Sequence, residues 1–218
     1  VYNEARVLPA LIPQLRQLAE RCELVVADGG SCDGTAEELA REFHVLATSK
    51  GRARQMNEGA RATSGDVIFF LHADSILPPN PVGQIQRVAR KHDAGCFGIR
   101  FDRRHPVLWF CSWMSNARVR VRGIAYGDQG IFMRRELFEE VGGFPDLSIM
   151  EDLQLSLNLR ERGVRFGMTR SRITTSSRRF GKDTVQILKT WCAMVPLRKM
   201  YREGADIQEI AARYRDIR

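Results

Sequence analysis

The stretch Asp66-Val-Ile-Phe-Phe-Leu-His-Ala-Asp74 decides the fold of this chain. Residues 67–71 form a short apolar run, rich in β-branched and aromatic side chains and bounded by turn residues, which is typical of a buried strand. Because the run lacks polar alternation, it predicts a central parallel strand that is covered on both faces. The stretch therefore belongs in the middle of an α/β sheet.

Two polar side chains at the end of this strand are candidates for binding a ligand. His72 and Asp74 are two residues apart, so they lie on the same side of an extended chain. Open α/β sheets bind ligands at this end of their strands, and a carboxylate there suits a divalent cation that holds phosphates. The alternative is structural: Asp74 caps the following turn, and His72 is a polar residue without a chemical role.

The length and composition fit one soluble globular domain. With 218 residues, 44% hydrophobic and 28% charged, the chain is large enough to bury a substantial core. Its five cysteines are odd in number and include no C-x-x-C pair, which argues against a disulfide framework or a zinc site and favours a reducing cytoplasm. No signal peptide opens the chain, and no segment reaches the roughly 20 apolar residues that cross a bilayer.

The positive charge is concentrated towards the end of the chain. Residues 160–218 contain 15 Lys and Arg against 6 Asp and Glu, whereas the remainder has 19 basic and 20 acidic residues. The whole excess of +8 therefore lies in the carboxyl-terminal part. Such a segment can meet an anionic membrane, a polyanionic substrate or the phosphates of a nucleotide, and the plain alternative is a solvated basic face.

A second strand that ends in an acid precedes the first stretch. Residues 23–28 predict a buried strand ending at Asp28, and Gly29-Gly-Ser-Cys-Asp-Gly-Thr35 follows as a tight turn before a helix over residues 36–42. Strand, acid, glycine-rich turn and helix are typical of a nucleotide-handling site, although the dinucleotide fingerprint G-x-G-x-x-G is absent. Because Val1 leads almost at once into a helical pattern, we expect the first strand of the α/β unit to be missing.

A third short strand over residues 44–47 leads to a helix that begins after Gly51. Gly51 permits the close approach of a ligand, while Arg52 and Arg54 offer charge and forked donors to a pyrophosphate. The alternative is a surface helix with solvated arginines.

The second acidic cluster, Glu151-Asp152, opens an amphipathic helix that ends near Gly163. A carboxylate at a helix start can act as a general base toward a hydroxyl. Acidic residues in a first helical turn are also favoured by the helix dipole, which gives a purely structural explanation.

Two later segments are open to a membrane interpretation. Residues 108–114 are apolar and aromatic; buried core is the preferred interpretation, and an acceptor-side helix or a membrane-facing patch are the alternatives. Residues 185–200 predict an amphipathic helix interrupted by Pro196, which lies either on a membrane surface or against the sheet edge. A short helix is predicted over residues 207–214.

These motifs together resemble the family 2 glycosyltransferases, enzymes of the GT-A fold that transfer sugar from a nucleotide sugar with inversion. The resemblance covers residues 1 to about 163, with the motifs in the family's order. The run Arg178-Arg-Phe-Gly181 is similar to a small bacterial group within the family. The six motifs are Tyr2-Asn-Glu4, Asp28-Gly-Gly-Ser-Cys-Asp-Gly-Thr35, residues 51–57, residues 65–74, Gly142-Gly-Phe144 and Glu151-Asp152.

The resemblance implies an α/β fold of the GT-A type, with a mostly parallel central sheet flanked by helices and without its first strand. It also implies one domain in three parts. Residues 1–90 would bind the nucleotide sugar, residues 91–163 would lie on the acceptor side, and residues 164–218 would form a basic helical extension.

A metal-dependent active site is implied as well. Asp74 corresponds to the last Asp of the family's D-x-D motif, which holds Mn²⁺ or Mg²⁺ on the diphosphate, and His72 is its candidate partner as a metal ligand. Asp152, or alternatively Glu151, corresponds to the catalytic base that deprotonates the acceptor hydroxyl as it attacks the anomeric carbon. The residues expected to bind the UDP- or GDP-sugar are Tyr2 and Glu4 beside the nucleoside, Asp28 at the base, Gly51, Arg54, His72 and Asp74.

Three features depart from the family pattern. His72 replaces the usual first Asp of D-x-D, so the contact to ribose or metal differs. The strand before Tyr2-Asn-Glu4 is absent, which removes a central strand and part of the base pocket. No Q-x-x-R-W follows Glu151-Asp152, so the chain is not predicted to be a processive polysaccharide synthase.

We therefore predict a metal-dependent, non-processive, inverting glycosyltransferase of the cytoplasm. Its acceptor would be small, lipid-linked or part of the cell envelope; peripheral contact with the inner face of the membrane stays open, and no nucleic-acid partner is expected. A nucleotidyltransferase is one alternative, but the glycine-rich triphosphate loop expected of it is not found. The other is a catalytically vestigial module whose basic C-terminal region binds an anionic membrane or a partner.

Overall fold

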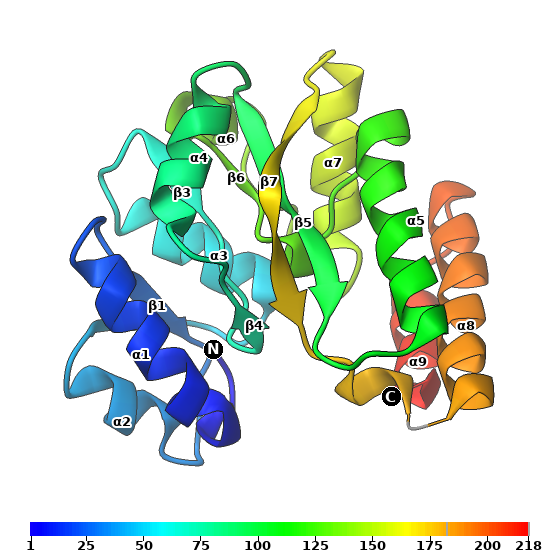
Figure 1. Cartoon of the computed structure of the whole chain (residues 1–218), viewed down its shortest axis with the longest axis horizontal. Coiled ribbons are helices and arrows are strands. Elements are labelled where there is room, and N and C mark those ends of the chain that lie inside the picture. The colour runs from blue at the N-terminus through cyan, green and yellow to red at the C-terminus, as the bar shows by residue number, and fades with distance from the viewer. Residues whose placement is uncertain (182, 218) are drawn as a thin grey trace.

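The structure of the chain, a computed structural model, describes residues 1–181 and 183–217, without the side chains of Arg179 and residues 215–217. Helices and strands alternate along it, as the apolar patterns predict (Figure 1). The first elements are η1 (Ala5–Val7), α1 (Leu8–Ala19), β1 (Val25–Asp28), α2 (Thr35–Ala40), β2 (His44–Ala47), α3 (Arg52–Arg61), β3 (Val67–Phe69), β4 (Ser75–Ile76) and α4 (Pro81–Ala89). They are followed by β5 (Ala94–Phe101), α5 (Pro106–Arg122), η2 (Gly127–Gln129), β6 (Phe132–Arg134), α6 (Arg135–Glu140), α7 (Glu151–Glu161), β7 (Phe166–Thr175), η3 (Arg178–Phe180), α8 (Thr184–Arg202) and α9 (Ile207–Ile217).

The strands form two sheets. β1 and β2 pair in parallel, and a five-stranded sheet has the order β3-β6-β5-β7-β4. In the larger sheet β5 and β7 pair in parallel, while the other three pairings are antiparallel. The α/β fold is confirmed, and its larger sheet is mixed rather than mostly parallel.

The strand on which the sequence prediction centres is shorter and placed differently from expectation. β3 ends at Phe69, lies at one end of the five-stranded sheet and runs antiparallel to its partner β6. The expected burial is confirmed for Ile68 and Phe70. An apolar run predicts that both faces of a strand are buried, but it does not predict whether the neighbouring strand is parallel or antiparallel.

An apolar cavity of about 390 Å³ separates β1 from the edge of β3 that faces away from β6. Val1 lies at this cavity and makes the two backbone hydrogen bonds of a parallel pair with Asp28. Its nitrogen donates to the carbonyl of Ala27 at 2.6 Å, and its carbonyl accepts from the amide of Gly29 at 3.0 Å. The cavity therefore lies where the family resemblance expects the strand that precedes Tyr2.

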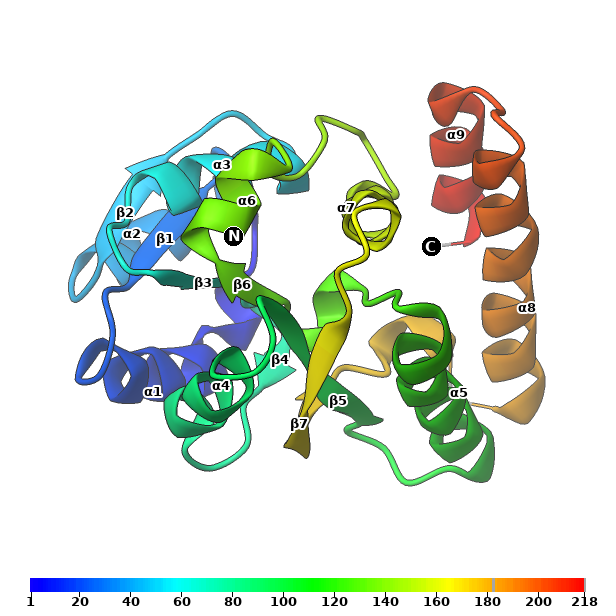
Figure 2. The same cartoon turned by 90° about the horizontal axis from the view of Figure 1, so that it is seen from above.

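Helices cover both faces of the larger sheet. Figure 2 shows α1 and α4 on one side of the strands and α3, α6 and α7 on the other. Phe97, Phe132 and Ile173 pack with the α4 side of the core, while Leu155 and Leu159 of α7 belong to the opposite side. This packing holds the ends of the strands, and the loops that follow them, in fixed positions.

The aromatic segment of residues 108–114 lies on α5 and is only partly buried. Leu108 and Cys111 face inward, whereas Trp109, Phe110 and Trp113 are exposed. The preferred prediction of buried core is therefore wrong for the aromatic side of this helix. The helical pattern places a residue on a face, but the element that covers that face is set by the tertiary structure.

The carboxyl-terminal elements differ from prediction in two details. β7 extends to Thr175 and lies inside the five-stranded sheet, so the helical part of the chain's end begins only after it. α8 continues through Pro196 without a break, and it lies beside α5 in both views. The division of the domain into three parts stays a prediction. None of the helices in the described residues is both long enough and apolar enough to span a bilayer.

Candidate active site

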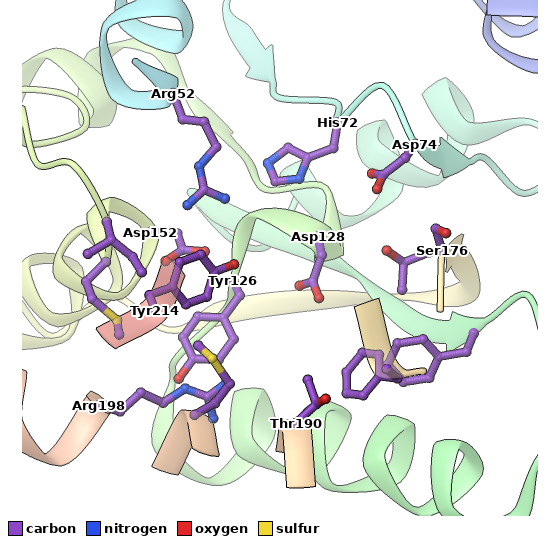
Figure 3. A pocket seen from close by; sticks show the side chains of 16 residues that line it. Arg52, His72, Asp74, Tyr126, Asp128, Asp152, Ser176, Thr190, Arg198 and Tyr214 are labelled. Atoms are coloured by element: carbon purple, nitrogen blue, oxygen red, sulfur yellow. The ribbon is translucent and has the colours of Figure 1, made fainter. Parts of the chain in front are cut away.

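A pocket of about 200 Å³ opens between the loops that follow β3 and β7 and the first residues of α3 and α7 (Figure 3). Its charged lining combines the carboxylates of Asp74, Asp128 and Asp152 with the guanidinium groups of Arg52 and Arg198. These groups come from distant parts of the sequence, so the fold assembles the pocket. The remaining lining residues are His72, Phe101, Tyr126, Ile149, Met150, Thr175, Ser176, Phe180, Thr190, Met194 and Tyr214.

The two candidate metal ligands, His72 and Asp74, both line this pocket. The imidazole lies against the turn at Gly127, where a Cβ would be only 2.6 Å from Nε2 of His72, so a larger residue there would have to displace the imidazole. One carboxylate oxygen of Asp74 lies 3.2 Å from the guanidinium of Arg178, which also lies 3.4 Å from a carboxylate oxygen of Glu4. Arg178 thus links two of the predicted donor-site residues.

The other amino-terminal donor residues lie beside the pocket rather than in its lining. Tyr2 is exposed, with the ammonium group of Lys50 4.1 Å from its ring centre. Asp28 is 4% exposed and holds the glycine-rich turn, since its Oδ2 accepts from the amides of Gly30 and Ser31 at 2.9 Å. A role of Asp28 at the nucleotide base stays a prediction.

The two arginines at the start of α3, Arg52 and Arg54, form ion pairs with different partners. Gly51 has φ of 146°, a backbone conformation that side chains other than glycine rarely adopt. Arg52 reaches into the pocket and pairs with Glu151 at 2.9 Å. Arg54 lies outside the lining and forms a forked pair with Asp146, with a closest contact of 2.8 Å. Arg52 is therefore the better placed of the two to meet a ligand in this pocket.

The two candidate bases differ sharply in their surroundings. Glu151 is 2% exposed and paired with Arg52; burial raises the pKa of its carboxyl, and the charge of Arg52 opposes that shift. Asp152 lines the pocket, and its Oδ2 accepts from the amide of Gly127 at 2.9 Å. Met150, just before them, has φ of 68°, a strained conformation for this residue type. The geometry therefore favours Asp152 as the group that faces a substrate.

Asp128 is a third carboxylate of the pocket that sequence reasoning missed. Its Oδ1 is buried and has no hydrogen-bond partner in the described residues. Burial raises the pKa of Asp128, and the charge of Arg118 opposes the shift. The available signal was an acid within the Gly127-Asp-Gln-Gly130 turn, directly before an apolar strand.

A stack of two arginines on a tyrosine forms one wall of the pocket. The guanidinium of Arg118 lies 3.7 Å from the ring centre of Tyr126, and that of Arg198 lies 4.7 Å from it. Arg118 also donates to Gln129 at 2.8 Å. Cation–π contacts of this kind fix the direction of the guanidinium groups. Arg198 was not expected at the site, because its contact with Tyr126 joins α8 to a loop far away in sequence.

The pocket fits a divalent cation that is shared with a ligand. Among the described residues, no three His, Cys, Asp or Glu side chains are grouped as a metal site. The imidazole of His72 and the carboxylate of Asp74 are, however, ligand types that Mn²⁺ accepts, and they line the same pocket. Sites of this kind use one or two protein ligands and take the rest from phosphates and water.

Solved structures with a similar architecture define the fold of the chain. A mannosyltransferase from Pyrobaculum calidifontis, PcManGT, in complex with GDP-Man and Mn²⁺ matches 98% of this chain and 67% of its own, with a TM-score of 0.63 and 20% identity. TarS residues 1–349 of S. aureus, in complex with UDP-GlcNAc, matches 100% of this chain and 69% of its own, with a TM-score of 0.62 and 12% identity. The fold is that of the GT-A glycosyltransferases.

The sequence comparisons place the chain within this class. Residues 1–149 match the model of glycosyl transferase family 2, and the chain belongs to that family. Curated relatives include an undecaprenyl-phosphate 4-deoxy-4-formamido-L-arabinose transferase of Serratia proteamaculans at 28% identity and one of Proteus mirabilis at 32%. Each match covers 62% of this chain and 46% of the relative, so the matched part spans about half the length of these relatives. The chain is a glycosyltransferase domain.

Proposed function

We propose that this domain transfers a sugar from a nucleoside diphosphate sugar to a lipid-linked acceptor, with inversion and one residue at a time. The observation that supports the proposal is that His72 and Asp74, in the loop between β3 and β4, line the same pocket as Asp152 at the start of α7. The proposed donor site and the proposed base would therefore share one cavity. The names of the curated relatives, which act on undecaprenyl phosphate, support the choice of a lipid-linked acceptor.

The donor would bind between the amino-terminal loops and the pocket. Tyr2, Glu4 and Asp28 would surround the nucleoside. Gly51 would lie along the diphosphate, and Arg54 would reach it only by leaving its pair with Asp146. The solved relatives hold GDP-Man and UDP-GlcNAc, and we propose a UDP- or GDP-sugar here. Asp74 and His72 would hold Mn²⁺ or Mg²⁺, which when bound neutralises charge on the departing diphosphate.

Asp152 would act on the acceptor. Its Oδ2, oriented by the amide of Gly127, takes the proton of an acceptor hydroxyl as that oxygen attacks the anomeric carbon. The new glycosidic bond forms while the bond from the anomeric carbon to the diphosphate breaks, and the nucleoside diphosphate leaves. Glu151 would orient Arg52 rather than exchange protons, because the two side chains are paired at 2.9 Å and Glu151 is buried.

The reaction would take place in the cytoplasm, with the protein in peripheral contact with the inner face of the membrane. A lipid-linked acceptor is confined to that surface, whereas the donor is water-soluble. The acceptor's polar end would enter the pocket beside Arg52 and Arg198, two cations that suit an anionic group. We propose no nucleic-acid partner.

Calorimetry of nucleotide binding tests the donor site. UDP and GDP are titrated, with and without Mn²⁺, into the protein and its Asp74→Ala variant. The matched control is Asp93→Ala, which removes an exposed carboxylate paired with Arg134 outside the pocket. We expect metal-dependent binding that Asp74→Ala abolishes and Asp93→Ala retains. Absence of binding to both nucleotides under every metal condition would contradict the proposal and favour a vestigial module.

A further inference from the structure

The exposed side of α5 and α8 carries an unusual concentration of large apolar side chains. Trp109 is 65% exposed and Trp113 54%, and Phe110 beside them is also exposed. On α8, Val185 is 59% exposed, and Leu188 and Val195 are exposed as well. We call this surface the α5–α8 face, formed by Trp109, Phe110, Trp113, Val185, Leu188 and Val195.

Helix geometry makes these side chains one continuous surface. Trp109 and Trp113 are one turn apart, and the exposed residues of α8 recur at helical spacing from Val185 to Val195. The two helices lie side by side, and Phe110 contacts Trp191 with 6.1 Å between ring centres (Figure 1). Contiguous apolar patches of this kind are rare on the surface of a monomer and mark a binding surface.

The charge of the two helices indicates what covers the face. Arg118 of α5 and Arg198 of α8 stack on Tyr126 at the pocket, which leaves Arg120 and Arg122 on α5 and Lys189, Lys199 and Arg202 on α8, and neither helix contains an acidic residue. Basic residues stand in the last turn of each helix, at Arg120 and Arg122 on α5 and at Lys199 and Arg202 on α8. Tryptophan beside Lys and Arg is typical of segments that lie in the headgroup region of an anionic bilayer.

The opposite side of α8 lines the pocket. Thr190, Met194 and Arg198 reach into it, so the same helix carries the exposed apolar face and part of the acceptor wall. A surface that contacts the bilayer through α8 would thus hold the pocket close to the lipid headgroups. An acceptor could reach Asp152 without leaving the membrane.

We propose that the α5–α8 face docks the protein onto anionic lipid bilayers, with its tryptophans inserted at the interface. The role of this docking, delivery of a lipid-linked acceptor to the pocket, rests on the proposed function, whereas the docking itself does not. Binding to vesicles is measured without donor, metal or acceptor. Absence of binding would therefore contradict the docking proposal and leave the proposed transfer reaction unaffected. A second copy of the chain is the competing occupant, and the experiment separates the two.

The three tryptophans of the chain, Trp109, Trp113 and Trp191, all lie at or beside this face, so intrinsic fluorescence reports on it directly. Vesicles of phosphatidylcholine alone and of phosphatidylcholine with an equal amount of phosphatidylglycerol are added to the full chain. We expect a blue shift and quenching by brominated lipid with the anionic vesicles, both weakened by salt. Unchanged emission with anionic vesicles would overturn the proposal.

Co-sedimentation with the same vesicles measures the contribution of single side chains. Trp109→Ser and Trp113→Ser should each lower partitioning roughly tenfold, since each withdraws a half-exposed indole from the interface. Ile76→Ser, at an exposed apolar residue of β4, is the matched control and should partition like the wild type. Circular dichroism confirms that each variant is folded.

Sedimentation velocity tests whether the α5–α8 face binds a second copy of the chain instead of a bilayer. If the wild type self-associates, Trp109→Ser disperses it, and vesicle partitioning is the same for both proteins, the face is an interface between copies and the proposal is wrong. A monomer that partitions onto anionic vesicles through these tryptophans supports it.

Discussion

Replacement of Arg178 by alanine should strengthen, not weaken, the binding of a divalent cation. The guanidinium of Arg178 lies 3.2 Å from a carboxylate oxygen of Asp74, the residue proposed to hold the metal, and 3.4 Å from one of Glu4. A cation that binds Asp74 must displace this contact. Arg178→Ala leaves the carboxylate accessible in advance, so the displacement no longer opposes binding.

The size of the effect follows from the exposure of the pair. The side chain of Arg178 is 47% exposed and that of Asp74 18%, so the attraction is screened by solvent. Ion pairs of this kind contribute about 0.2–1 kcal/mol. Removing the competitor should therefore raise the affinity for Mn²⁺ by about 1.4- to 5-fold, given that 1.4 kcal/mol corresponds to tenfold. The loss of one nearby positive charge should at the same time weaken nucleotide binding in the absence of metal.

The assay is titration of Mn²⁺ into nucleotide-free protein, with free Mn²⁺ followed by electron paramagnetic resonance. Arg178→Lys should restore part of the competition, since it keeps the charge. Arg16→Ala is the matched control, because it also removes an exposed arginine from an ion pair, with Glu42, outside the pocket. An affinity of Arg178→Ala for Mn²⁺ equal to or lower than that of the wild type would refute the competition.

Further predictions concern the turn that joins the acids of the pocket. Gly127→Ala would place a Cβ 2.6 Å from Nε2 of His72, so metal-dependent UDP or GDP binding measured by calorimetry should weaken while every carboxylate is retained. Asp128→Asn should raise the free energy of unfolding by about 1 kcal/mol at alkaline pH. Because burial raises the pKa of Asp128 in the folded protein, the wild type loses stability as pH rises from the ordinary value of 3.8 through the raised value. The gain should shrink as pH falls through that window, which urea unfolding at a series of pH values would show. Asp152→Asn should bind donor like the wild type but lower transfer to a hydroxyl acceptor by about 10²–10⁴-fold, as radiolabelled product reports.

The parts of the fold that depend on local pattern could be predicted from the sequence. Strand and helix order followed from apolar spacing, and the start of α7 at Glu151 followed from its acids and the leucines after them. That His72 and Asp74 lie in the pocket could be predicted because a buried strand ends shortly before them, while their roles stay a prediction. Each of these depends on neighbours within a few residues, which a sequence displays directly.

The missed features depend on contacts between distant residues. Arg178 meets Asp74 only because β7 carries the chain back to β4, and the antiparallel pairing of β3 depends on the route taken by β6. The exposure of Trp109 and Trp113 depends on which elements pack against α5. The exposed side of this helix is as aromatic as a buried core, so its composition alone does not reveal its exposure. Local pattern predicts that a face is apolar, but not whether this chain buries it.

The effect of Asp152→Asn on the transfer rate also shows whether the acceptor reacts through a hydroxyl or a phosphate. A hydroxyl must lose its proton as it attacks, so Asp152→Asn should depress transfer strongly. A phosphate acceptor, such as the one in the names of the curated relatives, carries a second pKa near 6 and is largely ionised at neutral pH, so it needs no base. With such an acceptor Asp152→Asn should change the rate only slightly, while Arg198→Ala, which removes a cation from the pocket, should raise KM. Measuring both variants with a lipid alcohol and a lipid phosphate of equal chain length separates the two. A large loss for Asp152→Asn with both lipids would show that its carboxylate serves the donor as well, and would remove the assignment of Asp152 as a base for the acceptor alone.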